Sequence, residues 1–195
     1  MVFSSFEFLF RFLPIFLILY YITPRNYKNH VLFAGSILFY AFGEVKFVLL
    51  LLVCVLINYV LGCLMYRDAI EGRGARQRFL LFLALGYDFG VLFLYKYSGI
   101  VDELPLGISF YTFQIAAYMI DVYRGKVPAE KSLVNLGTYL TMFPQLIAGP
   151  IINYSEVRFA LRRRTVTLAD FEEGLKVLIL GLGAKIKIGR ASCRE

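Results

Sequence analysis

A stripe of polar residues runs along one apolar segment of this 195-residue chain. Gly107, Tyr111, Gln114, Tyr118 and Asp121 are separated by four, three, four and three residues, so they share one face of a single helix. Such hydroxyl, amide and carboxyl groups can hydrogen-bond a reactant inside a membrane, or can join two membrane helices at a close contact. The sequence leaves both interpretations open: a helix seam and the wall of a reactant channel.

A second polar side chain, Gln145, directly follows Pro144 in another apolar segment. Proline frees a helical carbonyl from its usual N–H partner, and we expect the Gln145 amide to bond it. The candidates for the wall of a substrate tunnel are therefore Tyr111, Gln114, Tyr118, Asp121 and Gln145.

We expect two acidic residues, Asp121 and Asp88, to pair with charged or polar groups. Asp121 and Arg124 are spaced i,i+3 at one end of their segment, which predicts an interfacial ion pair. Asp88 lies inside an apolar run and needs a partner or a wet cavity; Lys96 is two turns away.

Familiar catalytic constellations are absent from the sequence. It has no Gly-rich phosphate loop, no nucleophile elbow and no metal-spaced His/Cys cluster, so we expect no bound cofactor or metal and nominate no catalytic residue. His30 is the only histidine, and we place it in solvent or among lipid headgroups. Cys54 and Cys63, nine residues apart on one helix, would lie about 13 Å apart, beyond disulfide reach.

The composition indicates that the chain lies in a lipid bilayer. Hydrophobic residues make up 59% of the chain, the mean hydropathy is +0.67 and charged residues are 18%, below the roughly 25% of soluble domains. The stretch 47–66 carries no charge over about the 20 residues that a bilayer requires of one helix. We therefore predict an integral membrane protein. The net charge of +7 is spread over loops, which argues against nucleic acid and favours anchoring of Arg162–Arg164 to anionic lipid headgroups.

Charge-free runs predict an all-α, polytopic membrane helical bundle. The first run is expected to be a retained helix rather than a cleaved signal, and 31–43 is too short to span alone, so it should form a tight hairpin with 47–66 at Gly43–Glu44. Pro105 should stand in the first turn of its helix. The runs are 6–22, 31–43, 47–66, 79–95, 104–120, 132–155 and 174–186.

Lys and Arg residues predict the topology. With Arg25 and Lys28 in the cytoplasm, alternate loops place most basic residues inside, as the positive-inside rule expects. A simple span over 132–155 would break the rule by placing the basic cluster at 158–164 outside. Pro144 and Gly149–Pro150 interrupt helical hydrogen bonding, so we predict a re-entrant segment that leaves Asn153–Arg164 cytoplasmic.

Three sequence words carry a resemblance to a known family: LGISFYTFQ at 106–114, DVYRG at 121–125 and FPQLIAGP at 143–150. In this order they resemble the membrane-bound O-acyltransferase family, in its bacterial alginate O-acetyltransferase-like branch. The resemblance implies a multi-pass enzyme of the bacterial inner membrane that moves an acyl group, commonly acetyl, from a donor to hydroxyls of an extracytoplasmic polysaccharide, with partner proteins of an acetylation machinery. The donor itself is not identified.

The family's essential histidine lies in a later membrane helix, typically beside tryptophan, whereas this chain has no Trp and no matching His. The resemblance therefore implies that residues 1–186 form the N-terminal part of such a domain, without its catalytic half. The alternatives are a non-enzymatic transport or assembly subunit and an isolated, inactive fragment. The connection at 97–103 is shorter than the family's usual one, and 187–195 reads like the translation of a sequencing adapter and is interpreted as non-native.

Just before the last predicted helix, Thr167 and Asp170, with Glu173 three residues beyond, predict a capping box at its start.

Overall fold

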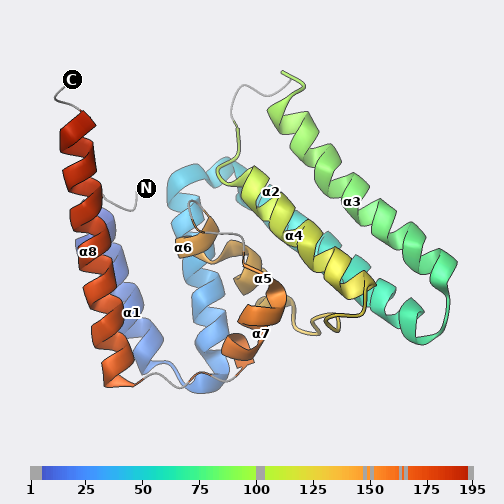
Figure 1. The fold of residues 1–195 in the computed structure, drawn as a ribbon, viewed down its shortest axis with the longest axis horizontal. Coiled ribbons are helices and arrows are strands. Elements are labelled where there is room, and N and C mark those ends of the chain that lie inside the picture. Colours follow the sequence, from blue (N-terminus) through green and yellow to red (C-terminus); the bar gives the residue numbers. More distant parts are fainter. Residues whose placement is uncertain are drawn as a thin grey trace.

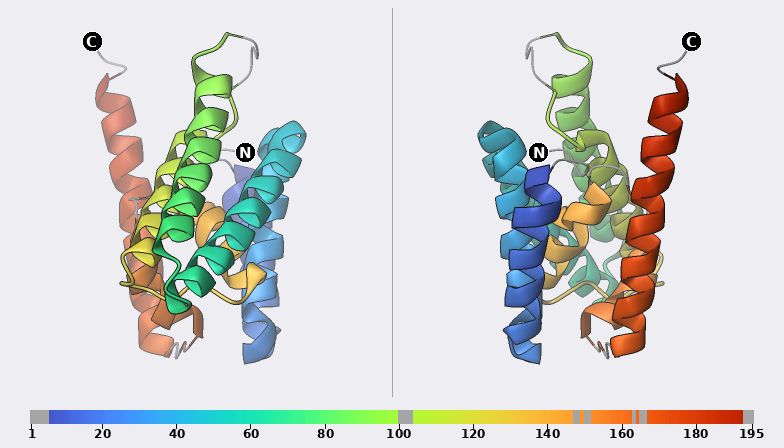
Figure 2. Two further views of the ribbon diagram at one scale, coloured as in Figure 1. Left: turned by 90° about the vertical axis from the view of Figure 1, so that its right-hand side faces the viewer. Right: turned by 90° about the vertical axis from the view of Figure 1, so that its left-hand side faces the viewer.

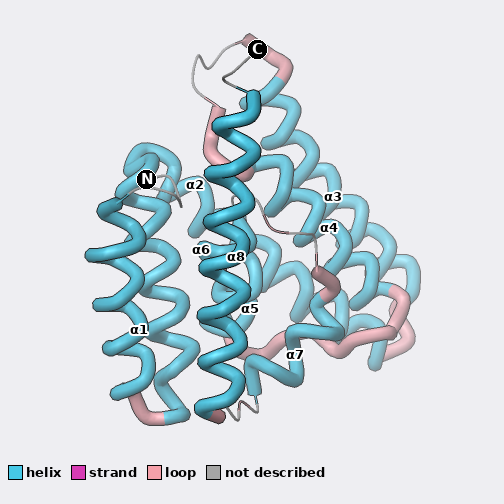
Figure 3. Tube along the Cα trace, turned by 60° about the vertical axis from the view of Figure 1, so that its left-hand side comes forward, coloured by secondary structure: helices cyan, strands magenta, loops and turns pink. Residues whose placement is uncertain are grey.

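The computed structural model describes residues 6–99, 104–146, 149, 152–162, 164 and 167–192, with the backbone alone at 168 and 185–192. The described residues form helices and turns without a strand (Figures 1 and 3). The predicted all-α membrane protein is confirmed. A π-helical turn (Phe8–Phe12) and a 3-10 turn (Arg25–Tyr27) flank the first helix. The α-helices are α1 (Leu13–Ile22), α2 (Lys28–Ile70), α3 (Gly74–Lys96), α4 (Ile108–Tyr123), α5 (Leu133–Thr141), α6 (Phe143–Leu146), α7 (Tyr154–Arg162) and α8 (Leu168–Ser192).

The predicted hairpin appears as a sharp break inside α2. Glu44 leaves helical geometry (φ −152°, ψ 80°), and the two halves of α2 run in opposite directions from it (Figure 1). The Glu44 carboxylate accepts a hydrogen bond from the backbone N–H of Leu106 at 2.7 Å, which ties the break to the loop before α4. The helical halves extend beyond the charge-free runs, to Lys28 and Ile70, because charged residues are tolerated at the ends of membrane helices.

The start of α4 differs from the prediction. The helix begins at Ile108, so Pro105 lies in the preceding turn rather than in the first helical turn. Gly107 adopts the left-handed conformation (φ 73°), and a Cβ there would lie 2.6 Å from the carbonyl oxygen of Leu146. Only glycine accepts both the positive φ and this close approach of α6. The turn that places Gly107 beside Leu146 therefore determines where α4 begins, and Pro105 does not.

The second half of α2 packs with α3 and α4 in a three-helix group (Figures 1 and 2). Large apolar side chains on its outer faces stay exposed, among them Leu49 at 70%, Phe82 at 72% and Phe93 at 62%. Such exposure is costly in water and expected against lipid, where no hydrophobic force drives these side chains inward. The residues Arg25–Ile70 and the helix Gly74–Lys96 are both long and apolar enough to cross a bilayer.

Basic loops gather at one end of the molecule. The turns at 23–27, 71–73 and 124–132, together with α7, lie at the lower end of Figure 1, whereas the break at Glu44 and the end of α3 lie at the upper end. This alternation is the one that the distribution of Lys and Arg predicts. The side of the membrane that each end faces stays a prediction.

The charge-free run 132–155 contains the two short helices α5 and α6 and ends at the start of α7. The nine-residue α5 is about 14 Å long, less than half of a hydrocarbon core of roughly 30 Å. Helix α7, the next helix, lies at the basic end again (Figure 3). The re-entrant segment stays a prediction with which this placement agrees. Pro150, on which the prediction partly depended, lies outside the described residues.

Aromatic rings surround Phe143, the first residue of α6. Phe143 contacts the rings of Phe8, Phe12, Phe16 and Phe39 at centroid distances of 6.0, 5.5, 5.2 and 5.4 Å. These rings come from the N-terminal helix and the first half of α2. The phenylalanines of these two segments therefore hold the start of α6 in place.

Helix α8 includes the predicted run 174–186 and begins with the predicted capping box. The backbone N–H and the hydroxyl of Thr167 both donate to Asp170 Oδ2, at 2.8 and 2.7 Å, and the Asp170 N–H donates to Thr167 Oγ1 at 3.3 Å. Phe171 meets the ring of Tyr21 at 5.9 Å. The interpretation of 187–195 as non-native stays a prediction, and Cys193 lies outside the described residues.

Candidate functional site

The polar face of α4 points into the bundle. Tyr111, Gln114 and Tyr118 are 2%, 3% and 1% exposed. The Gln114 side-chain amide donates to the backbone carbonyl of Tyr139 on α5 at 2.8 Å, and the Tyr118 hydroxyl accepts from the Glu130 N–H at 2.9 Å. Two of the predicted tunnel residues thus join α4 to α5 and to the loop before α5.

The five predicted tunnel residues do not meet at one point. Tyr111 and Asp121 are ten residues apart on α4, which corresponds to about 15 Å along the helix. Gln145 lies toward the Tyr111 end of α4, because its neighbour Leu146 shares an apolar cluster with Tyr111. Their contribution to a substrate tunnel, and the expected bond from the Gln145 amide to a freed carbonyl, stay predictions. Sequence reasoning missed Ser36, whose hydroxyl accepts the N–H of Phe143 at 3.3 Å just before Pro144.

Asp121 and Asp88 have other partners than those that the sequence suggested. Asp121 forms its ion pair with Lys126 at 3.5 Å, since the turn after α4 folds Lys126 back toward the helix. Lys96 is bonded to Ser109 at 3.4 Å, and Asp88 turns instead toward α2. The spacing along one helix did not reveal the partner on the neighbouring helix.

Asp88 is buried between α3 and α2. Its Oδ1 accepts from the Asn58 side-chain amide at 2.7 Å and from the Cys54 thiol at 3.5 Å. The same amide also donates to the backbone carbonyl of Cys54 at 3.1 Å. Cys54 and Cys63 are both free, which confirms that they form no disulfide.

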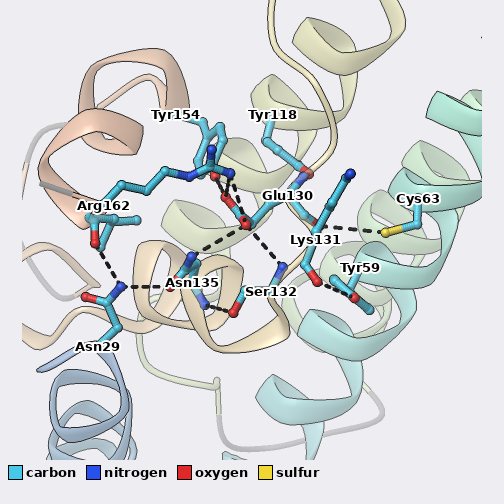
Figure 4. Close-up of polar contacts among 11 residues, drawn as sticks. Asn29, Tyr59, Cys63, Tyr118, Glu130, Lys131, Ser132, Asn135, Tyr154 and Arg162 are labelled. Carbon is cyan, nitrogen blue, oxygen red and sulfur yellow. Dashed lines mark hydrogen bonds and ion pairs between the residues drawn. The ribbon is translucent and has the colours of Figure 1, made fainter. Parts of the chain in front are cut away.

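Among the described residues, Glu130 in the loop between α4 and α5 gathers several polar contacts (Figure 4). Its side chain is buried, with 3% exposure, and accepts from the Tyr154 hydroxyl, from Arg162 at 3.1 Å and from the Ser132 N–H at 3.1 Å. Burial alone would raise the pKa of Glu130, but the bonds from Tyr154 and Ser132 and the charge of Arg162 hold it below its ordinary value. Glu130 is thus kept ionised where the start of α5 meets α7.

A second layer of bonds extends from this carboxylate to the N-terminal helices. Asn135 contacts Glu130 at 3.5 Å, and its side-chain oxygen accepts from Asn29 at 2.7 Å. Arg164 donates to Asn29 at 2.9 Å and to the Tyr20 hydroxyl at 2.7 Å. The network therefore ties α1, α2, α5 and the residues after α7 together at the basic end.

The opposite side of the same loop is fixed to the second half of α2. The Tyr59 hydroxyl donates to the Lys131 carbonyl at 2.8 Å, and the Cys63 thiol contacts the Glu130 carbonyl at 3.7 Å (Figure 4). Sequence reasoning missed the whole Glu130 site, because Glu130 looks like one residue of a solvated loop and its partners lie 24 and 32 positions later.

These groups bind and position other groups rather than react. His30 is exposed and its ring lies 5.8 Å from that of Tyr27. Among the described residues, no three His, Cys, Asp or Glu side chains come together to hold a metal. The described part of the chain thus offers a polar helix face on α4 that is hydrogen-bonded to α5 and to the loop before it.

An apolar groove of about 820 Å³ lies outside these sites, between the N-terminal helix and the first half of α2. Glu7, Arg11 and Thr23 are the polar side chains in its wall.

Comparison with known proteins shows what the chain is similar to. It is 38% identical to the probable alginate O-acetylase of Pseudomonas putida, over 96% of this chain and 42% of the relative, and 38% identical to that of Pseudomonas aeruginosa, over 96% and 40%. A peptidoglycan O-acetyltransferase of Helicobacter pylori is 25% identical over 96% of this chain and 44% of its own length. No family model and no solved structure matches the chain.

The chain spans about two fifths of the length of the curated alginate O-acetylases that it matches. This share fits the expectation that the catalytic half lies elsewhere. These matches confirm the predicted resemblance to the alginate O-acetylase-like branch of the membrane-bound O-acyltransferases, over a span that corresponds to less than half of each relative.

Proposed function

We propose that this chain is part of a multi-pass enzyme of the bacterial inner membrane that transfers an acyl group, most simply acetyl, to hydroxyls of an extracytoplasmic polysaccharide. The observation that carries the proposal is the 38% identity to alginate O-acetylases along 96% of the chain. The relative that acts on peptidoglycan is more distant, at 25%, which favours an alginate-like acceptor. Every one of these relatives is named for acyl transfer, so nothing favours the transport or assembly alternative.

A sugar hydroxyl is a weak nucleophile at neutral pH, so transfer needs a base that removes its proton as it attacks the donor carbonyl. The resemblance assigns that base to a histidine in a later helix. In this proposal the described residues build the wall: α4 presents Tyr111, Gln114 and Tyr118, and the re-entrant hairpin presents Gln145. Their burial keeps water from the donor.

A chimera tests the proposal directly. The residues of the Pseudomonas putida acetylase that this chain matches are replaced by this chain, and the chimera is expressed in an alginate-producing host without its own acetylase. We expect base-labile acetyl esters on the exported alginate. A chimera that is inserted in the membrane at the normal level but leaves the alginate unacetylated would contradict the proposal.

The tunnel role of the polar residues needs its own test in the same chimera. We expect Gln114→Leu and Gln145→Leu to lower acetylation more than they lower the amount of folded protein, because each removes a polar group from the proposed wall. Phe113→Leu, on the exposed side of α4, is the matched control. If acetylation follows protein amount in all three variants, the two glutamines have a packing role only.

A further inference from the structure

Asp88 is a carboxyl group at membrane depth whose bonded neighbours, in the part of the chain that the structure describes, are uncharged. It is 1% exposed and lies well inside α3, a helix long and apolar enough to cross a bilayer. Within the described residues its bonded neighbours are the Asn58 amide and the Cys54 thiol, and no Lys, Arg or His pairs with it. Lys96, the basic residue nearest in sequence on its own helix, is bonded to Ser109.

The other titratable groups that face this site are neutral in their ordinary state. Among the described residues they are Cys54 on α2, Tyr87 and Tyr95 on α3, Tyr111 on α4 and Tyr40 on the first half of α2, which lie in or against one apolar cluster. An ionised carboxylate here would be buried without a counter-charge, which is among the most costly arrangements in a protein interior.

Four buried polar atoms around this site have no hydrogen-bond partner among the described residues: Asp88 Oδ2, Asn58 Oδ1 and the hydroxyls of Tyr40 and Tyr111. The first two are both acceptors when the carboxyl group is ionised. One proton on Asp88 Oδ2 changes that atom into a donor, and Asn58 Oδ1 is an acceptor that it can serve, on the same amide that already bonds Asp88 Oδ1. The bond already present, from the Asn58 amide to Asp88 Oδ1, then completes an acid–amide pair.

We propose that Asp88 and Asn58 form a proton-binding site inside the membrane, in which Asp88 is held as the neutral acid by its pairing with the Asn58 side chain. A bound metal ion is the weaker alternative, because hard cations require six or more oxygen ligands and the site offers one carboxyl group and one amide. The site would couple the α2–α3 contact to proton activity, and it does not depend on the acyl-transfer proposal.

Infrared spectroscopy of the purified chain in lipid vesicles tests the proposal. We expect the difference spectrum between the wild type and Asp88→Asn, taken at neutral pH, to contain a carboxylic-acid C=O band that shifts in D2O. The matched control is Asp68→Asn on α2: Asp68 is also buried, at 2%, but pairs with Arg73 at 3.8 Å and Arg76 at 3.3 Å. Its difference spectrum should contain carboxylate bands. Carboxylate bands in the Asp88→Asn difference would overturn the proposal.

Asn58→Leu provides a second variant in case Asp88→Asn does not fold. It keeps the acid and removes its partner, so the C=O band should persist and move in frequency. A band that stays in place would show that the acid is not paired with Asn58.

Thermal unfolding in the same vesicles distinguishes a proton from a metal ion. We expect this site to lower the unfolding temperature of the wild type progressively as the pH rises above about 4, the ordinary pKa of an Asp side chain, because the unfolded chain then ionises Asp88 while the folded chain holds it neutral; Asp88→Asn should remove this contribution. A sodium-dependent rise of the unfolding temperature, present in the wild type and lost in Asp88→Asn, would overturn the proposal in favour of a cation site.

Discussion

Glu130 and Asp88 are both buried acids, at 3% and 1% exposure, yet the chain surrounds them in opposite ways. Glu130 lies at the basic end and receives a guanidinium, a phenol and a backbone N–H. Asp88 lies between two membrane helices and receives an amide and a thiol. Burial alone therefore does not determine which partners an acid receives.

The two sites also connect different parts of the chain. Glu130 joins the start of α5 to α7, and through Asn135 to Asn29, so it fixes elements that are far apart in sequence. Asp88 joins only α3 to α2, which already lie side by side along most of their length. Loss of the first site should therefore be the more damaging.

The largest effect is expected from Glu130→Ala. It leaves the Arg162 guanidinium and the Ser132 N–H without their acceptor, and we expect the free energy of unfolding to fall by about 3 kcal/mol, the upper end of the range for hydrogen bonds to a charged group. Arg162 is half exposed, which keeps the loss below that of a fully buried pair. Denaturant unfolding in detergent micelles measures it. Glu156→Ala, an exposed acid on α7, is the control, and an equal loss there would mean that burial of Glu130 is irrelevant.

A smaller loss is expected from Asn58→Leu. The substitution removes the amide donor to Asp88, which costs about 1–3 kcal/mol for a buried polar group left without its partner. The double variant Asn58→Leu with Asp88→Leu should be more stable than Asn58→Leu alone, because both polar partners are then replaced. The same unfolding measurement applies. A double variant less stable than the single one would show that Asp88 has another essential partner.

The pH dependence of stability separates the two acids by sign. The pKa of Glu130 is lower in the folded chain than its ordinary value near 4.5, so its contribution is present above that pH and is lost as the pH falls through the folded pKa. We expect the unfolding temperature to fall in acid, and Glu130→Gln to reduce this fall. Under the proposal for Asp88 the sign is opposite: its contribution to stability decreases as the pH rises above about 4, where the unfolded chain ionises this side chain. An acid response that survives unchanged in Glu130→Gln would assign it to other carboxylates.

The smallest effect is expected from Glu71→Gln. Glu71 pairs with Arg67 at 2.7 Å and Arg73 at 2.9 Å at the basic end, as Glu130 pairs with Arg162, but it lies on the surface. Exposed ion pairs contribute little because water and salt screen them. We expect no measurable change in unfolding temperature in physiological salt. A loss as large as that of Glu130→Ala would show that charge pairing, rather than burial, governs this end.

Much of the fold could be predicted from the sequence. The apolar runs gave the helices, the break at Gly43–Glu44 gave the hairpin within α2, and the Thr167 capping box gave the start of α8. These features depend on residues within a few positions of one another. The prediction for Pro105 was wrong because a distant contact, of Gly107 with Leu146, moved the start of α4.

The sites could be predicted only in part. Residues 111, 114 and 118 were placed on one buried face of α4, as their spacing indicates, but their partners were not predicted. Asp88 was recognised as needing a partner, and the one it takes lies 30 positions earlier. Glu130 gave no signal at all, since an acid in a short polar loop looks the same whether it is solvated or buried.

The sequence by itself determined that this is a membrane protein of helices, and which loops carry the positive charge, because hydrophobic length and loop charge are local properties of the chain. Only the tertiary structure decided which polar groups meet. It pairs Glu130 with Tyr154 and Arg162, and Asp88 with Asn58, because at a buried position each polar atom needs a partner, and the partner is supplied by whichever helix packs there.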